Sequence, residues 1–217
     1  MFVLLSLVSA LADDSADLIA YAAELDTVDA RIADVDTWYA AAPGPEHVAE
    51  GEKRSEELKK AAVRSREINR ALVAVKGRFE AGSKADQARV PEVDALMDRV
   101  RAQTAARTSA VSAIDAGLAL ERVIGGDPKA FAQLNNSLYT AVQFRPADAK
   151  SDVDLWLRKP LEVALEKEQW AMVFSWGSWC EAACKDGAFA KRALESVPER
   201  HGRDARWLAL LTAPPAP

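Results

Sequence analysis

The fold class follows from residues 18–39, LIAYAAELDTVDARIADVDTWY. Apolar residues recur there at alternating steps of three and four, a spacing that places them on one face of an α-helix. The seven members of this series are Leu18, Tyr21, Leu25, Val28, Ile32, Val35 and Tyr39. Such a long, narrow apolar seam is typical of a coiled coil. We therefore expect a long helix from about Asp14 to Ala42 that packs lengthwise against another helix.

A second seam of the same spacing follows a helix-breaking segment. Residues 41–47, AAPGPEH, contain two prolines around a glycine, and a proline inside a helix removes a backbone hydrogen bond. A second helix is predicted from about Glu46 to Ala81, with the seam Leu58, Ala61, Ser65, Ile68, Leu72, Val75 and Phe79. Because the connection is short, the two helices should form an antiparallel hairpin.

Opposite charges support this pairing. Residues 13–36 carry eight acids and one arginine, a net charge of −7, whereas residues 53–78 carry nine basic residues and three acids, a net charge of +6. Charges on neighbouring helices set register and partner choice. We assign the basic residues to this role rather than to nucleic acid, and the chain's net charge of −5 also argues against a general nucleic-acid binder.

A third helix is predicted from Pro91 to about Ile124, with proline at its first position. Its seam runs through Val93, Met97, Val100, Thr104, Arg107, Val111, Ile114 and Leu118. Thr104 and Arg107 occupy positions where apolar residues are expected. Either they form a solvated waist, with Arg107 meeting an acid of the first helix, or they line a polar pocket for a small ligand. Three helices of this length, each about 45 to 55 Å, predict an elongated bundle.

The remaining chain predicts a compact cluster of shorter helices. Gly125 and Gly126 end the third helix, and Asp127-Pro128 begins a fourth, amphipathic one. The sequon at Asn135 lies inside this helix, so we do not interpret it as a glycosylation site. The expected domains are the bundle over 13–125, a Trp- and Cys-containing helical region over 126–212, and a disordered tail over 213–217.

The first twelve residues predict a secretory signal. An uncharged apolar run ends in Ala10-Leu11-Ala12, a small-x-small cleavage pattern, directly before two aspartates. The alternative is an apolar helical turn packed into the core. Export would place the protein in the periplasm or outside the cell, where two cysteines can stay oxidised. No later segment is apolar and long enough to be expected to span a membrane.

Both cysteines lie in SWGSWCEAACKDG, residues 175–187. In a helical interpretation, one stripe runs through Leu161, Leu165, Met172, Trp176, Trp179 and Ala183, interrupted only at Glu168. Gly177 would mark a kink or a boundary between helices. Cys180 and Cys184 are then four residues apart on one face, within disulfide range but poorly aimed along a straight helix. They form a local disulfide, pair with another chain, or remain free.

A second interpretation makes residues 170–176, WAMVFSW, a buried strand that leads into a helix beginning at the cysteines. This arrangement resembles the start of a thioredoxin-like domain, in which a strand precedes a W-C-x-x-C-K motif. The resemblance implies a thiol–disulfide redox protein with Cys180 as the attacking thiol and Cys184 as the resolving one. The spacing here is one residue longer than the family's usual motif, and only 33 residues follow Cys184.

Together these patterns predict an all-α, non-enzymatic, exported protein that binds a protein partner or itself, with a structural role in the cell envelope. Trp170, Trp176 and Trp179 are the expected interaction residues. The alternatives are the redox protein and a sensor-type bundle that holds a small ligand near Thr104 and Arg107. We expect no cofactor and no metal, because His47 and His201 lie far from the cysteines in settings expected to be exposed.

Overall fold

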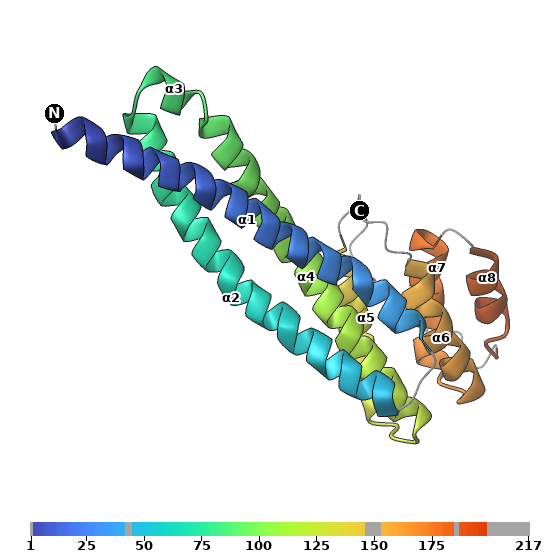
Figure 1. The fold of residues 1–217 in the computed structure, drawn as a ribbon. Helices are drawn as coiled ribbons and strands as arrows, with labels where there is room; N and C mark the ends of the chain where they lie inside the picture. Colours follow the sequence, from blue (N-terminus) through green and yellow to red (C-terminus); the bar gives the residue numbers. More distant parts are fainter. Residues whose placement is uncertain (1, 42–44, 146–152, 185–186, 199–217) are drawn as a thin grey trace. The chain divides into compact units, whose positions relative to one another are not determined.

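In the computed structural model, every regular element of the described part of the chain is an α-helix, which confirms the all-α prediction (Figure 1). The structure describes residues 2–41, 45–145, 153–184 and 187–198, and it describes their side chains except at 2–13, 45, 182 and 183. The helices are α1 (Phe2–Ala40), α2 (Pro45–Ala81), α3 (Lys84–Gln87), α4 (Val90–Ile124), α5 (Ala130–Gln143), α6 (Val153–Glu166), α7 (Trp170–Ala183) and α8 (Gly187–Glu195).

The ends of the long helices follow their local chemistry. Pro45 opens α2, where a proline's missing N–H is harmless. Gly126 ends α4 with a left-handed φ of 97°, and its N–H donates to the Val123 carbonyl at 3.1 Å. The short helix α3, between α2 and α4 in Figure 1, is absent from the sequence prediction. It begins at a capping box in which the side chains of Ser83 and Asp86 each accept a backbone N–H.

The start of α1 differs from its prediction. The helix begins at Phe2 rather than near Asp14, so it includes the apolar segment expected to be a signal. The backbone of residues 2–12 is thus helical, which fits both a signal segment and an apolar helical turn. Export of the protein remains a prediction.

The chain forms two compact units. Unit 1 consists of Met1–Ile32 and Glu56–Arg107, and unit 2 of Ala33–Ser55 and Thr108–Pro217. These ranges divide α1, α2 and α4, whereas the sequence pattern places the boundary at residue 125. The reason lies in unit 2, where the shorter helices pack onto segments of the long ones. Tyr39 donates its hydroxyl to the Trp156 carbonyl at 2.9 Å, and Ser109 donates to the Ala141 carbonyl at 2.7 Å.

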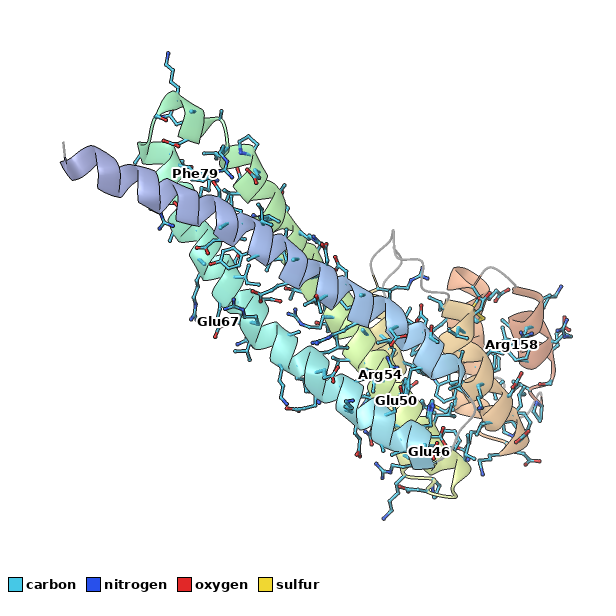
Figure 2. The ribbon with its side chains drawn as sticks, in the orientation of Figure 1. Glu46, Glu50, Arg54, Glu67, Phe79 and Arg158 are labelled. Carbon is cyan, nitrogen blue, oxygen red and sulfur yellow. A yellow bond between two sulfur atoms is a disulfide. The ribbon has the colours of Figure 1, made fainter. Side chains whose placement is uncertain are left out.

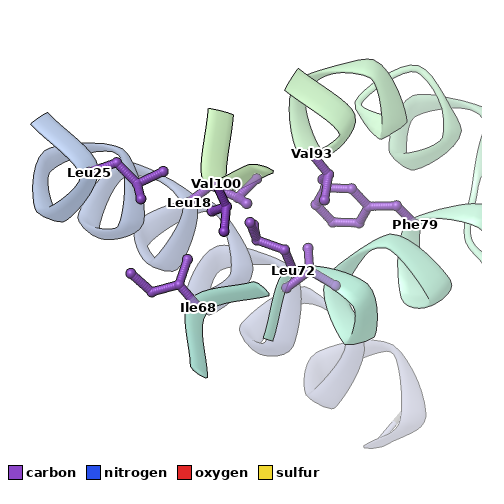
Figure 3. Close-up of a cluster of buried hydrophobic side chains, with 8 residues drawn as sticks. Leu18, Leu25, Ile68, Leu72, Phe79, Val93 and Val100 are labelled. Atoms are coloured by element: carbon purple, nitrogen blue, oxygen red, sulfur yellow. The ribbon is translucent and has the colours of Figure 1, made fainter. Parts of the chain in front are cut away.

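Unit 1 is built around aliphatic side chains from α1, α2 and α4 (Figure 3). Its buried cluster consists of Leu18, Leu25, Ile68, Leu72, Val75, Phe79, Val93 and Val100, all of them predicted seam residues. Ion pairs show the helix directions. Arg78 pairs with Asp14 and Arg64 pairs with Glu24, so α2 runs antiparallel to α1. The predicted hairpin is therefore confirmed within unit 1.

The third helix of unit 1 completes the bundle. Arg89 of the α4 N-terminus donates to Ser15, and Arg99, further along, donates to Asp29 at 3.0 Å, so α4 runs parallel to α1. Lys76 of α2 meets Asp94 of α4 at 2.7 Å. The acids of α1 are therefore shared between basic residues of α2 and α4, whereas the charge pattern of the sequence predicts pairing mainly with α2.

Unit 2 has an aromatic core. Its largest fully buried side chains are Trp156, Trp176, Ile114, Leu134, Leu138 and Leu157. The Trp38 ring occupies space that two glycines leave open, because a Cβ added at Gly117 would lie 2.7 Å from the ring and one at Gly51 would also overlap it. Helix α7 packs against α6 and α8. Leu194 of α8 approaches α7 at Gly177, so this glycine serves close packing and not a helix boundary.

The helix break in the cysteine region lies at Glu168. This residue has a left-handed φ of 52°, and its N–H donates to the Leu165 carbonyl at 3.1 Å. The next N–H, that of Gln169, donates to the Ala164 carbonyl at 2.8 Å, which completes a helix-ending turn usually built with glycine. Residues 170–183 form α7, so the strand interpretation is wrong. Among the described helices, none contains a stretch apolar and long enough to cross a membrane.

Candidate functional site

A pocket of about 350 Å³ lies between α2 and α4 within unit 1. Its lining consists of Ser65, Arg66, Asn69, Arg70, Met97, Val100, Arg101, Thr104 and Arg107. Thr104 and Arg107, the two polar interruptions of the predicted third seam, both belong to it. Ser65, which interrupts the predicted seam of the second helix, belongs to it as well. The polar positions of the two seams therefore meet across one pocket.

Arg107 is the most constrained of these side chains. It is 8% exposed, and its NH1 group donates to the Ser65 hydroxyl at 3.2 Å. The same hydroxyl donates to the Ala61 carbonyl at 2.9 Å, which leaves its lone pairs free to accept from the guanidinium. No carboxylate of the described residues forms an ion pair with Arg107. Its expected meeting with an acid of the first helix is therefore not what the structure shows.

The electrostatic environment of Arg107 is unfavourable. Burial lowers the pKa of its guanidinium, and the positive charge of Arg66 lowers it further. A guanidinium nevertheless remains protonated at neutral pH. A buried cation without a counter-charge loses hydration without recovering Coulomb energy. A ligand with negative charge would supply the missing interaction.

Three further arginines line the same pocket, and all three are exposed. Arg66 donates through Nε to the Ala62 carbonyl at 3.3 Å. Arg101 pairs with Asp98 at 2.9 Å, but both side chains are 68% exposed, and such surface pairs contribute little free energy. Arg70 forms no ion pair within the described part of the chain. These guanidinium groups can therefore turn toward a ligand at small cost.

The basic residues of α2 divide between two roles. In unit 1, Arg64 and Arg78 pair with acids of α1, as the charge pattern predicts. In unit 2, Arg54 pairs with Asp34 and with Glu50, which lies one turn away on α2 (Figure 2). Arg66 and Arg70 instead line the pocket on the α4 side. Helix pairing thus explains only part of the basic run.

The chemistry of the lining suits an anion. Four guanidinium groups come together with the hydroxyls of Ser65 and Thr104 and the amide of Asn69, while Met97 and Val100 supply apolar surface. None of these lining residues is acidic. The planar guanidinium fork binds carboxylate and phosphate oxygens through paired, charge-assisted hydrogen bonds.

The three predicted interaction tryptophans have packing contacts in unit 2. Trp176 is fully buried and donates through Nε1 to Asn135 at 2.9 Å. Trp179 is 2% exposed and lies against the Tyr139 ring, with centroids 5.9 Å apart. Trp170, at the start of α7, is half-buried. Trp176 and Trp179 therefore offer almost no surface to a partner, and Asn135 of the sequon is engaged with Trp176.

The two cysteines form a disulfide at the end of α7. Cys184 is the C-cap of α7, where the backbone becomes extended (φ −81°, ψ 149°), and its Cα lies 4.7 Å from that of Cys180. This Cα–Cα distance is shorter than the roughly 6 Å of an i, i+4 pair on a straight helix. Cys180 lies in the last turn of α7 and not at a helix N-terminus, the position that lowers a thiol pKa in the thioredoxin-like arrangement. Asp154 lies near both sulfurs, but the disulfide leaves no thiolate to bind a metal.

The expected exposure of His47 is wrong. This residue is 8% exposed, and its imidazole stacks on Trp38 with ring centroids 4.3 Å apart. Its Nε2 lies 3.7 Å from a Glu121 carboxylate oxygen. Trp38 of α1 and Glu121 of α4 therefore contact the start of α2, which the sequence pattern treats as a loop-like end. His201 lies outside the described residues.

Comparison of the chain with known protein families, with curated proteins and with solved structures gives no match. The pocket of unit 1 is therefore the feature on which we base a function.

Proposed function

We propose that this protein is a non-enzymatic binding protein and that the pocket between α2 and α4 is where it takes an anionic group. The observation that carries this proposal is Arg107, a buried guanidinium with no carboxylate partner in the described structure, facing a pocket that holds three other arginines. The proposal unites two expectations from the sequence: binding of a partner, and a polar bundle pocket at Thr104 and Arg107.

Stability alone gives no reason for this arrangement. An apolar side chain of similar volume at a buried, unpaired charge is usually neutral or stabilising. Like charges in one pocket also repel each other, as the effect of Arg66 on the pKa of Arg107 shows. A carboxylate or phosphate group would remove both penalties, so the binding free energy would include the relief of this repulsion.

We further propose that binding takes place outside the cytoplasm. The apolar N-terminal segment before Asp13-Asp14 supports export, and the Cys180–Cys184 disulfide suits an oxidising compartment. A role in a cell-envelope assembly remains our interpretation of the long helices. Fractionation of cells that express the tagged chain, with and without residues 2–12, would test export.

Calorimetric titration and thermal denaturation with inorganic phosphate and with citrate test the pocket. Both anions should raise the melting temperature more than sodium chloride at equal ionic strength, because a ligand bound only by the folded state stabilises it. Arg107→Met should lose most of this effect. Arg31→Gln, which removes a charge from the exposed face of α1, is the matched control and should keep it. Equal anion binding by the Arg107 variant and the parent would overturn the proposal.

A further inference from the structure

We propose that the pocket is the centre of a docking groove for an acidic amphipathic helix of a partner protein, which lies along α2 and α4. This inference rests on the proposed function, because the arginines of the pocket supply the charge. It goes further by naming the class of partner and by including surface that lies beside the pocket.

The first wall of the groove is an outward stripe on α2. Val63, Arg66, Arg70 and Val73 are spaced three, four and three residues apart, so they lie on one face of the helix. Val63 and Val73 are each 53% exposed, so the stripe presents apolar surface to the solvent. The stripe covers about 15 Å, at 1.5 Å per residue. Its two arginines lie between the two valines and line the pocket.

The second wall is on α4. Met97, Arg101 and Thr104 are spaced four and three residues apart and all line the pocket. Lys76 meets Asp94 at 2.7 Å and Arg107 meets Ser65 at 3.2 Å, so α4 runs antiparallel to α2 with these two contacts at opposite ends. The two walls therefore border the same stretch of groove.

The pattern of these walls matches a helix better than an isolated anion. Steps of three and four residues on both walls are the spacing with which one helix packs into the groove between two others. An occupant with acids at matching steps would meet Arg66, Arg70 and Arg101. Its apolar residues would cover Val63, Val73 and Met97, which a phosphate ion leaves exposed. The partner is thus defined by both charge and apolar surface.

A second copy of this chain is a poorer occupant. The acidic helix of the chain is α1, and several of its acids already have partners within unit 1. Asp14 pairs with Arg78, Glu24 with Arg64, and Asp26 with Arg99. Docking of α1 from a second copy would require these ion pairs to break. An acidic helix from another protein meets the groove without this loss.

The probe is a three-heptad synthetic peptide with leucine at the a and d positions and glutamate at e and g, labelled for fluorescence anisotropy. One control peptide has the same composition in scrambled order, and a second has lysine in place of glutamate. The acidic amphipathic peptide should bind the full chain at least about tenfold more tightly than either control, and more weakly as salt rises. Equal binding of the scrambled peptide would overturn the docking groove while leaving the anion pocket intact.

Variants of the exposed valines separate the two proposals. Val63→Ser with Val73→Ser should weaken peptide binding about tenfold, since apolar surface is lost, and should leave phosphate binding unchanged. Ile19→Ser, a change of the same kind at a 72% exposed position on α1, is the matched control and should bind the peptide normally. Equal peptide affinity of the double variant and this control would overturn the groove. If the parent chain is a dimer and the double variant is a monomer, the proposal of a partner helix is also overturned, because the occupant of the groove is then a second copy. Failure of both phosphate and peptide to bind would overturn both proposals.

Discussion

The two units bury different kinds of polar group. Unit 2 contains the five described tryptophans and buries neutral polar groups. Trp156 donates to Asp36 at 2.9 Å and Trp176 donates to Asn135, whereas the buried Nε1 of Trp179 has no hydrogen-bond partner among the described residues. Unit 1 has a core that is aliphatic except for Phe79, with partly exposed ion pairs between its helices. It buries the charged side chain of Arg107, its last residue, with only a serine hydroxyl as hydrogen-bond partner. A hydrogen-bonded polar group in a core stabilises the fold, whereas a buried charge without a counter-charge beside a pocket is a candidate binding group.

The largest effect is expected in the aromatic core of unit 2. Trp176→Ala should lower the free energy of unfolding by about 3–5 kcal/mol, because it creates a large cavity beside Phe131 and leaves Asn135 without its donor. Trp170→Ala, at a half-buried position on the same helix, should cost clearly less. Urea denaturation followed by circular dichroism measures both. Equal losses would show that the packing of Trp176 is no more important than that of Trp170.

The second effect concerns the two glycines around Trp38. Gly117→Ala should destabilise the protein by about 1–2 kcal/mol, because overlap with the rigid indole outweighs the gain in helix propensity. Gly77→Ala is the matched control in unit 1. Nothing lies within 4 Å of a Cβ added there, so this variant should gain about 0.5–1 kcal/mol. A lower melting temperature for the Gly117 variant and a higher one for the Gly77 variant would support the close packing of Trp38. A higher melting temperature for the Gly117 variant would contradict it.

The third effect tests the difference between the two units in how they bury polar groups. Arg107→Met should raise the stability of the protein by about 1 kcal/mol, because it removes a desolvated charge without a counter-charge. The same variant should lose anion binding. A chemical denaturation curve beside the titration measures both quantities on one sample. Strong destabilisation would mean that Arg107 is a structural residue and that the two units do not differ in the way described.

The smallest effect is the pH dependence from His47. Burial lowers the pKa of this imidazole, and the nearby charge of Lys159 lowers it further, while Glu50 acts in the opposite direction. The unfolded chain binds the proton near the ordinary pKa of 6.5, and the folded chain binds it only at lower pH. His47 therefore favours folding fully above pH 6.5, and this contribution falls as the pH decreases below that value.

His47→Gln should flatten the stability profile between pH 7 and pH 5, measured as urea midpoints. Glu121, whose pKa burial raises, acts with the opposite sign just above its ordinary value of 4.5 and is present in both proteins. Comparison of the two profiles thus isolates the histidine. An unchanged slope would show that the imidazole gains no proton on unfolding in this range.

Periodicity was sufficient for the long helices, because their seams, prolines and terminal glycines are local signals. The break at Glu168 was visible only as an interruption of a stripe, since a non-glycine residue in the left-handed conformation has no sequence signature. The pocket was half predicted. Thr104 and Arg107 stood out as polar residues in an apolar seam, but Arg66 and Arg70 were indistinguishable from the arginines that pair with α1. Only the orientation of α2 about its own axis decides which of its arginines face α1 and which face the pocket beside α4.

The Cys180–Cys184 bond has a consequence for maturation. The chain has two cysteines, so oxidation within one molecule has a single product and requires no reshuffling among alternatives. The partners are only four residues apart, and the bond can close as soon as the end of α7 takes shape, before distant parts of the chain meet. An oxidising environment is all that this step demands, and an isomerase has no wrong pairing within the chain to correct.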